Sequence, residues 1–183
     1  MAFWVYRNSY GFASSETLVK FYLSNTPQFR PYIRIESNNT IRALFGHADN
    51  SENSIYSSAA SFTSNWVHVA FSADESYKRL CVTEFDLISP VTNCEFQTFS
   101  PAVGWDPDGT SAAIYIGDDS NYIYDNFQGK MVDVRYYPAK ALTSVEVEAI
   151  VAATTCIGGT EDCTGPDHTS VKYLYLSEKN WEY

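Results

Sequence analysis

The stretch Trp66-Val67-His68-Val69-Ala70-Phe71-Ser72 decides the fold, because large apolar residues alternate along it with polar or small ones. Its two valines and Phe71 share one side, and Trp66, His68 and Ala70 share the other. A period of two is the mark of a β-strand that has one face in a core. A polar turn follows at 74–76, and residues 78–84 (KRLCVTE) are expected to form the returning strand.

Similar short runs, rich in aromatic and β-branched residues, recur along the chain. The further strands expected are 2–6, 17–23, 31–36, 40–45, 112–117, 130–137 and 171–176. Residues 37–39 (SNN) join two of them and predict a hairpin, in which Tyr32, Arg34 and Glu36 face the side opposite to the two intervening isoleucines. Many short strands with frequent turns predict an all-β antiparallel sandwich or barrel.

One short helix is expected near residue 145. Thr143-Ser144-Val145-Glu146 fits the S/T-x-x-E capping box, and an apolar-rich segment, 145–151, follows it. A helix this short is unstable alone in water, so we expect it to pack as a lid on a sheet edge or rim.

Specific roles are expected for two residues, one just before the strand 130–137 and one within it. Gly129 is placed where a strand bends or backbones approach closely. Asp133 lies on an otherwise apolar strand and, once buried, needs Arg135 or a backbone amide as its partner. We read Asp133 as a residue that supports the fold.

Composition and charge limit the classes of function. A chain of 183 residues with 45% hydrophobic positions is long enough for one domain with its own core. The net charge of −10 disfavours nucleic acids and anionic membrane surfaces, since the sequence shows no basic patch. The sequence also has no apolar run of ~18 residues that would insert into a membrane.

The four cysteines are Cys81, Cys94, Cys156 and Cys163. Pairing the sequence neighbours would join two adjacent strands through Cys81 and Cys94, and would close a Gly-rich loop through Cys156 and Cys163. Buried reduced thiols and, less readily, a zinc site are the alternatives. Disulfides favour an extracellular or cell-surface location, and so does the glycosylation sequon Asn38-Asn39-Thr40.

Two stretches read together resemble the laminin-G-like group of the concanavalin A-like lectin/glucanase superfamily. The first is 65–71 (NWVHVAF) with its returning strand 78–82 (KRLCV). The second runs from 115–117 (YIG) through 127–137 (FQGKMVDVRYY) to 141–146 (ALTSVE). Residues 2–6 (AFWVY) are similar to an early strand of the group.

The resemblance implies a two-sheet jelly-roll sandwich over residues 1–153, with one short helix. The group usually has one or two strands before the one matched by 2–6, so we expect the first strand to be missing or to be supplied by 171–176. Residues 154–183 do not resemble the group, and we interpret them as a Cys- and Gly-containing loop followed by a C-terminal extension, either an added strand or a linker.

The resemblance also implies a rim where ligands bind. Laminin-G-like modules often hold calcium there, and Asp118, Asp119 and Asp125 follow an expected strand end with the oxygen ligands that calcium prefers. Solvated acidic turns are the alternative, here and at 106–109 (DPDG). Trp105, Tyr122, Tyr124 and Tyr77 lie in or beside polar loops, and the first three are our ligand-binding candidates. Plugging the ends of the sandwich is the competing interpretation for Trp105 and Tyr124.

Catalysis is not expected. Residues 84–89 (EFDLIS) resemble the E-x-D-x-x-E strand of laminarinase-like hydrolases, but Ser89 replaces the second catalytic glutamate, and retaining hydrolysis needs two carboxyl groups. The three histidines are scattered, and His68 is interpreted as a half-buried side chain rather than a base.

These observations predict a non-catalytic extracellular recognition or adhesion module that binds a glycan or a protein through its rim loops, with calcium as a candidate cofactor. One alternative is a structural subunit of a surface filament or coat that self-assembles through sheet edges and terminal segments. A degenerate glycoside hydrolase is the other.

Overall fold

The computed structural model describes residues 1–7, 15–23, 32–46, 52–60, 62, 65–73, 77–85, 90–98, 112–117, 127–137, 140–153 and 172–174. Within these residues the chain forms eleven strands and one helix, α1 (Ser144–Ala153). The strands are β1 (Ala2–Arg7), β2 (Glu16–Leu23), β3 (Tyr32–Ile35), β4 (Thr40–Gly46), β5 (Glu52–Ala59), β6 (Trp66–Ala73), β7 (Tyr77–Phe85), β8 (Pro90–Thr98), β9 (Ala112–Ile116), β10 (Gly129–Tyr136) and β11 (Lys172–Leu174).

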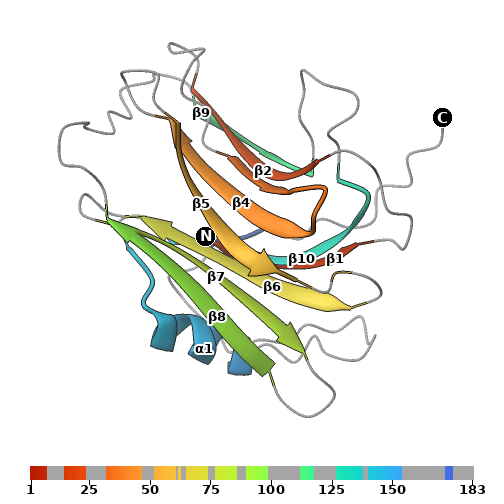
Figure 1. Ribbon diagram of the computed structural model, residues 1–183, viewed down its shortest axis with the longest axis vertical. Coiled ribbons are helices and arrows are strands. Elements are labelled where there is room, and N and C mark those ends of the chain that lie inside the picture. The colour runs from red at the N-terminus through yellow and green to blue at the C-terminus, as the bar shows by residue number, and fades with distance from the viewer. Residues whose placement is uncertain are drawn as a thin grey trace.

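The strands form two antiparallel sheets that face each other (Figure 1). The six-stranded sheet has the order β11-β10-β1-β6-β7-β8, and the five-stranded sheet has the order β5-β4-β3-β2-β9. Helix α1 lies on the side of the six-stranded sheet that faces away from its partner (Figure 1). The predicted all-β sandwich with one short helix is therefore confirmed.

The core lies between the sheets and contains the apolar residues that the alternation assigned to it. Val67, Val69 and Phe71 of β6 point into it, opposite Ile33 and Ile35 of β3. Each fully buried side chain of this kind contributes about 1.5–3 kcal/mol relative to an exposed one. Burial of the whole set therefore fixes which face of each strand points inward.

A second, smaller apolar cluster joins α1 to the outer face of the six-stranded sheet. The sheet presents Ala2, Ala70 and Cys81 there, in register on β1, β6 and β7. Leu142 and the buried α1 residues Val147 and Ile150 pack on them. The row of small side chains lets the helix approach the sheet closely. Helix α1 therefore covers part of the outer face of the six-stranded sheet as well as the region near its edge strand β8.

The capping box starts α1 as the sequence predicts. The Glu146 carboxylate accepts hydrogen bonds from the Thr143 backbone nitrogen (2.9 Å) and hydroxyl (3.0 Å). The Glu146 backbone nitrogen donates to the Thr143 hydroxyl at 3.2 Å. Lys140 pairs with the same carboxylate at 2.6 Å. These contacts hold the pKa of Glu146 down at about 2, first through Lys140 and then through Thr143.

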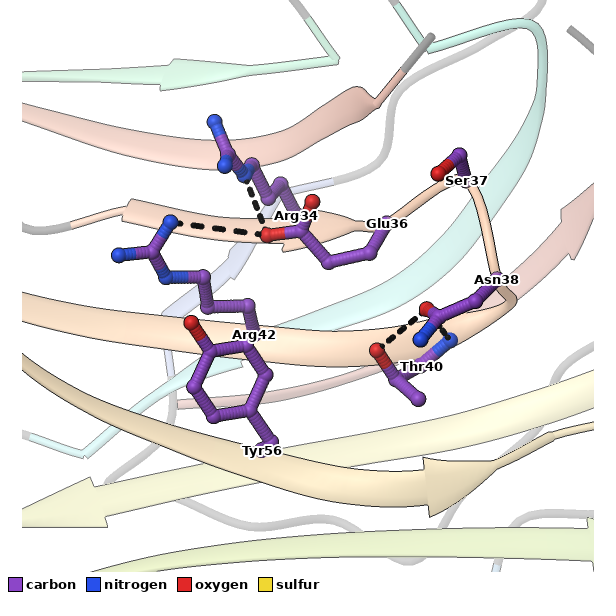
Figure 2. Close-up of a pocket in the computed structure, with 7 residues that line it drawn as sticks. All are labelled: Arg34, Glu36, Ser37, Asn38, Thr40, Arg42 and Tyr56. Carbon is purple, nitrogen blue, oxygen red and sulfur yellow. Dashed lines mark hydrogen bonds and ion pairs between the residues drawn. The ribbon is translucent and has the colours of Figure 1, made fainter. Parts of the chain in front are cut away.

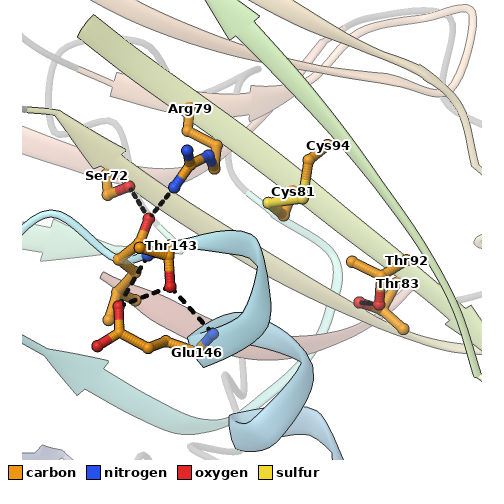
Figure 3. Close-up of a disulfide and its surroundings, with 9 residues drawn as sticks. Ser72, Arg79, Cys81, Thr83, Thr92, Cys94, Thr143 and Glu146 are labelled. Atoms are coloured by element: carbon orange, nitrogen blue, oxygen red, sulfur yellow. Dashed lines mark hydrogen bonds between the residues drawn. A yellow bond between two sulfur atoms is a disulfide. The ribbon is translucent and has the colours of Figure 1, made fainter.

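The predicted Cys81–Cys94 disulfide joins the neighbouring strands β7 and β8 (Figure 3). Beside it, the Ser72 hydroxyl and the Arg79 guanidinium both donate to the Leu142 carbonyl oxygen, at 3.1 and 2.6 Å. These contacts attach the segment before α1 to the sheet. Cys156 and Cys163 lie outside the described residues.

Strand β10 contains a bulge at Asp133. The β1–β10 register shifts between Ala2 and Trp4, and Asp133 adopts a left-handed φ of 52°. This conformation suits the extra residue of a bulge. It directs the Asp133 carboxylate to the Arg135 guanidinium, with N–O distances of 2.7 Å, which confirms the predicted partner.

Three further features bear on the sequence expectations. A Cβ at Gly129 would overlap the Tyr6 carbonyl oxygen and the Phe127 ring, so the predicted close approach is confirmed. Strands β5 and β8 are absent from the expected ranges: the serine-rich segment around β5 lacks clear alternation, and a strand at β8 was implied only by the expected Cys81–Cys94 link. Strand β11 pairs with β10 at the edge of the six-stranded sheet. Among the described helices, none has the length and apolarity needed to cross a membrane.

Candidate functional site

A shallow polar depression of about 490 Å³ lies on the outer face of the five-stranded sheet (Figure 2). It spans the β3–β4 hairpin and the adjacent edge strand β5. Its walls are seven residues: Arg34, Glu36, Ser37, Asn38, Thr40, Arg42 and Tyr56. We call these residues, together with Tyr32, the Arg/Tyr face.

Strand alternation places these side chains on the outside. On β3, Ile33 and Ile35 are buried in the core, so Arg34 points the other way. On β4, Arg42 lies between Ile41 and Ala43, which are both buried. The cross-strand register sets Arg34 opposite Arg42 and Arg42 opposite Tyr56. Burial of the inward residues in the core therefore fixes which side chains form the outer face, although no outer-face residue takes part in the core.

Glu36 sits between the two arginines. The Arg34 Nε donates to Glu36 Oε1 at 2.8 Å, and the Arg42 Nη1 lies 3.8 Å from the same oxygen. The Arg42 Nε donates to the Ser54 hydroxyl at 2.9 Å. Figure 2 shows both guanidinium groups directed at the one carboxylate. The two arginine side chains are thus held in place at the wall of the depression.

Two tyrosine rings flank the guanidinium groups. The Arg34 guanidinium carbon lies 4.9 Å from the centroid of the Tyr32 ring, and that of Arg42 lies 5.7 Å from it. On its other side, Arg42 lies 5.5 Å from the Tyr56 centroid. Planar guanidinium groups stack well on aromatic faces. Tyr56 is nevertheless 49% exposed, so its ring remains accessible to a ligand.

The depression is confined to strands β3, β4 and β5. Next to it on β2, Thr17 and Lys20 lie opposite Arg34 and Tyr32, and both are buried. The open part of the sheet surface therefore ends at β3. A ligand at this site would contact the hairpin and the edge strand.

A buried ion pair between β1 and β2 holds the turn of the β3–β4 hairpin in place. The Arg7 Nε, at the end of β1, donates to Glu16 Oε1 of β2 at 2.8 Å, which links the two sheets. The Arg7 Nη1 donates to the Asn39 side-chain oxygen at 2.7 Å. Asn39 occupies the left-handed turn position, with a φ of 62°. The turn that carries Asn38 and Thr40 is thus fixed to the rest of the sandwich.

The local charge of the site differs in sign from that of the whole chain. Two arginines and one glutamate give the Arg/Tyr face a formal charge of +1, from 2 − 1, against −10 for the protein. The site combines fixed donors, one acceptor carboxylate and exposed ring surface. It can hydrogen-bond polar groups of a ligand and stack on its apolar faces.

His68 does not act as a base in this structure. It was predicted to be half-buried, but it is only 1% exposed, and its ring packs at a tilt against Trp4, with ring centroids 5.0 Å apart. Burial, reinforced by the positive charge of Arg135, lowers its pKa to about 3. The imidazole is therefore neutral near pH 7 and cannot reach a substrate.

The rim residues predicted from the sequence lie outside the described residues. This applies to the ligand-binding candidates Trp105, Tyr122 and Tyr124 and to the metal-ligand candidates Asp118, Asp119 and Asp125. The described part of the chain holds no cluster of three or more His, Cys, Asp or Glu residues that could bind a metal ion.

Two hydrogen bonds fix the residues that flank the acidic segment 118–126. The Phe127 backbone nitrogen donates to the Gly117 carbonyl oxygen at 3.0 Å, and the Gly117 nitrogen donates to the Leu18 carbonyl oxygen at 2.8 Å. The two ends of this loop therefore meet beside β2, at the end of β9.

Sequence reasoning found the β3 row of the Arg/Tyr face, three of its eight residues, without recognising it as part of a site. The alternation of Tyr32, Arg34 and Glu36 against isoleucines was visible, and it signalled an outward polar row. Tyr56 was missed because β5 was missed. A pocket formed by side chains of three strands depends on their register, which the sequence alone did not supply.

Comparison with known proteins identifies the fold family. Residues 1–148 match a laminin G-type family profile described as "Concanavalin A-like lectin/glucanases superfamily". No curated protein matches the chain significantly.

Two solved structures share the fold. The LG1-3 region of the laminin alpha2 chain is 12% identical, with a TM-score of 0.57, and the alignment covers 78% of this chain and 28% of the laminin chain. A native heptameric SAP-like pentraxin from Limulus polyphemus is 16% identical, with a TM-score of 0.50, over 81% of this chain and 67% of the other. The chain accordingly belongs to the concanavalin A-like lectin/glucanase superfamily as a laminin G-like domain.

Proposed function

We propose that this chain is a non-catalytic recognition or adhesion domain of the extracellular space or cell surface, and that it binds a glycan through the Arg/Tyr face. The observation that carries the proposal is the packing of Arg34 and Arg42 against two tyrosine rings around Glu36, in an open depression. The disulfide between β7 and β8 supports the extracellular location.

Glycans suit this chemistry better than a flat protein epitope does. A sugar ring offers closely spaced hydroxyl groups, which arginine donors and a carboxylate acceptor can bind in a fixed geometry. It also has an apolar face, which an exposed ring such as that of Tyr56 can cover. The local positive charge favours glycans that carry a carboxylate or sulfate group.

The rim loops are a second part of the proposal. Trp105, Tyr122 and Tyr124 would extend the contact area, and Asp118, Asp119 and Asp125 would hold calcium. The hydrogen bond between Gly117 and Phe127 supports this part of the proposal, since the segment that carries the acidic residues starts and ends beside the end of β9. Extracellular protein remains the alternative ligand for the same loops.

For the domain boundaries, we propose a sandwich over 1–153 and an extension over 154–183. The family match ends at residue 148, and β11 adds a strand beside β10. This pairing supports an added strand rather than a free linker.

A glycan array with the secreted chain tests the ligand. We expect binding to acidic glycans and at least about tenfold weaker binding by Tyr56→Ala, because a lost stacking contact of ~1.4 kcal/mol corresponds to that factor. Arg42→Lys keeps the charge but loses the planar fork, so it separates hydrogen-bond geometry from electrostatics.

Two controls locate the binding surface. Tyr136→Ala removes a comparably exposed tyrosine (40%) from the six-stranded sheet and should leave binding unchanged. Trp105→Ala tests the rim. A loss confined to Trp105→Ala would move the site to the rim loops, and an array without any signal would reject glycan recognition.

Calcium is tested separately by thermal unfolding. We expect a chelator to lower the Tm and added calcium to restore it, because a ligand at about 100 times its Kd stabilises by ~2.7 kcal/mol. Asp119→Asn should abolish the response. An unchanged Tm in chelator would remove calcium from the proposal.

Self-assembly is a second candidate function, favoured by the open edge of the six-stranded sheet. Strand β8 ends that sheet and pairs only with β7 among the described strands. A free strand edge can accept a strand from another chain. Ordered oligomers in light scattering, together with a blank glycan array, would favour this role.

The family also includes glucanases, and the catalytic alternative rests on Glu84 alone. Glu84 lies on β7, opposite Val67 of β6 and Val91 of β8. Hydrolysis of β-glucans that is lost in Glu84→Gln would restore the enzyme interpretation.

A further inference from the structure

The β3–β4 turn carries the chain's one sequon, Asn38-Asn39-Thr40. The pattern N-x-T is the acceptor for N-linked glycosylation in secreted proteins. A sequon is informative only where the folded protein can accommodate a glycan. The position and contacts of Asn38 allow that to be judged.

Asn38 is an exposed turn residue whose side chain is already oriented. Its Oδ1 accepts hydrogen bonds from the Thr40 hydroxyl at 2.7 Å and the Thr40 backbone nitrogen at 3.1 Å (Figure 2). Its Nδ2, the atom that would carry the sugar, makes no hydrogen bond to any of the described residues. Attachment of a sugar there would break no existing contact in this part of the structure.

Asn38 is also a wall of the Arg/Tyr face. It lines the same depression as Arg42 and Tyr56. The turn has little freedom to swing away, because Arg7 holds Asn39 at 2.7 Å and is itself buried in an ion pair with Glu16. A glycan on Asn38 would therefore start at the edge of the depression, and its first sugars would be held close to the depression.

We propose that Asn38 carries an N-linked glycan whose first sugars lie over the Arg/Tyr face and screen it from large ligands. In the transfer step, the Asn38 amide nitrogen forms a bond to the anomeric carbon of N-acetylglucosamine and loses one proton. The bond from that carbon to the diphosphate of a polyprenyl-linked oligosaccharide donor breaks, and the polyprenyl diphosphate leaves. The proposal shares with the proposed function only the secreted location and the identity of the face.

Occupancy is tested on the full chain secreted from a eukaryotic host. We expect the intact mass to fall by the mass of one glycan on N-glycosidase treatment, and peptide mapping to place the modification at Asn38. Asn38→Gln and Thr40→Ala should remove it, whereas Thr40→Ser keeps the sequon and should retain it. A secreted wild-type chain with unmodified Asn38 would overturn the proposal.

Screening is tested by nitration of tyrosines with tetranitromethane, quantified for each peptide. We expect Tyr56 to react several-fold faster in Asn38→Gln and Thr40→Ala than in the glycosylated wild type and in Thr40→Ser. Tyr136, exposed on the other sheet, should react equally in all four proteins. Equal Tyr56 rates in glycosylated and unglycosylated chains would show that the glycan does not cover the face.

These measurements need no added ligand. A glycan array that stays blank with the unglycosylated Asn38→Gln chain as well as with the wild type would reject the recognition proposal and leave both results standing. Conversely, an unmodified Asn38 would leave the Arg/Tyr face as a permanently open site.

Discussion

Two ion pairs of the same chemistry lie on the outer faces of the two sheets. Arg34 and Glu36, two positions apart on the hairpin, approach to 2.8 Å with side chains 25% and 17% exposed. Asp133 and Arg135, also two positions apart, approach to 2.7 Å with side chains 6% and 1% exposed. The first pair is on the open face, and the second is on the covered one.

The difference in exposure gives the two pairs different roles. A buried pair contributes little net stability, but removing one partner leaves a buried charge and costs about 3–5 kcal/mol. A pair near the surface, such as the half-buried Arg34 and Glu36, is worth about 0–1 kcal/mol. Arg135 and Asp133 therefore stabilise the fold. By contrast, replacing the contact between Arg34 and Glu36 with contacts to a ligand costs little free energy.

The largest expected effect comes from breaking the buried pair. Asp133→Ala should lower the free energy of unfolding by about 3–5 kcal/mol, because the buried, charged Arg135 loses its carboxylate partner. Glu36→Ala, the matched change on the open face, should cost less than about 1 kcal/mol. Urea unfolding of both variants gives the comparison.

The variant Asp133→Asn serves as the control for an effect of backbone strain at this position. Asparagine tolerates the left-handed φ of 52° but carries no charge. We expect it to lose much of the same stability. Near-wild-type stability of Asp133→Asn would attribute the loss in Asp133→Ala to the backbone instead.

A second prediction uses the neutral His68 beneath the covered face. Its folded-state pKa of about 3 lies below the ordinary 6.5, so the unfolded chain takes up the proton first as the pH falls. Stability should decline from about pH 6.5 downward, by roughly 2 kcal/mol between about pH 7 and pH 5, until the loss is complete below about pH 3.

His68→Gln removes this titration. The stability difference between wild type and variant, measured by urea unfolding at a series of pH values, should therefore shrink or change in favour of the variant as the pH falls. Two parallel stability curves would contradict the burial of a neutral imidazole.

The smallest expected effect concerns the fit of the helix on the sheet. Ala70→Leu adds volume to the closely packed row under α1 and should cost about 1–3 kcal/mol. The matched change Ala59→Leu, at an exposed position of β5, should lie within about 0.5 kcal/mol of wild type. Thermal unfolding compares them, and equal Tm values would mean that α1 does not seal this face.

The sequence predicted the elements that a single strand or turn encodes. The alternation in β6, the capping box of α1, the Cys81–Cys94 link and the partner of Asp133 are all local patterns or adjacent-strand features, and the structure confirms them. Strand β5 escaped because its outward serines weaken the contrast between its faces.

The candidate site was harder to predict for a physical reason. The Arg/Tyr face needs the register of three strands, and register is set by core side chains that lie on the opposite side of the sheet. The alternation that turns alternate β3 side chains outward is visible in the sequence, but the residues of β4 and β5 that lie beside them are not. The rim residues Trp105, Tyr122, Tyr124, Asp118, Asp119 and Asp125 lie outside the described residues and stay predictions.

The hydrogen bond between Phe127 and Gly117 has an evolutionary consequence. It joins the two residues that flank the segment 118–126, and Gly117 is itself bonded to Leu18 of β2, so the sandwich fixes both ends of that segment. Lengthening a closed loop costs only about 0.6 kcal/mol per doubling. Related domains can therefore differ in length and sequence at this segment while the sandwich beneath keeps its sequence constraints.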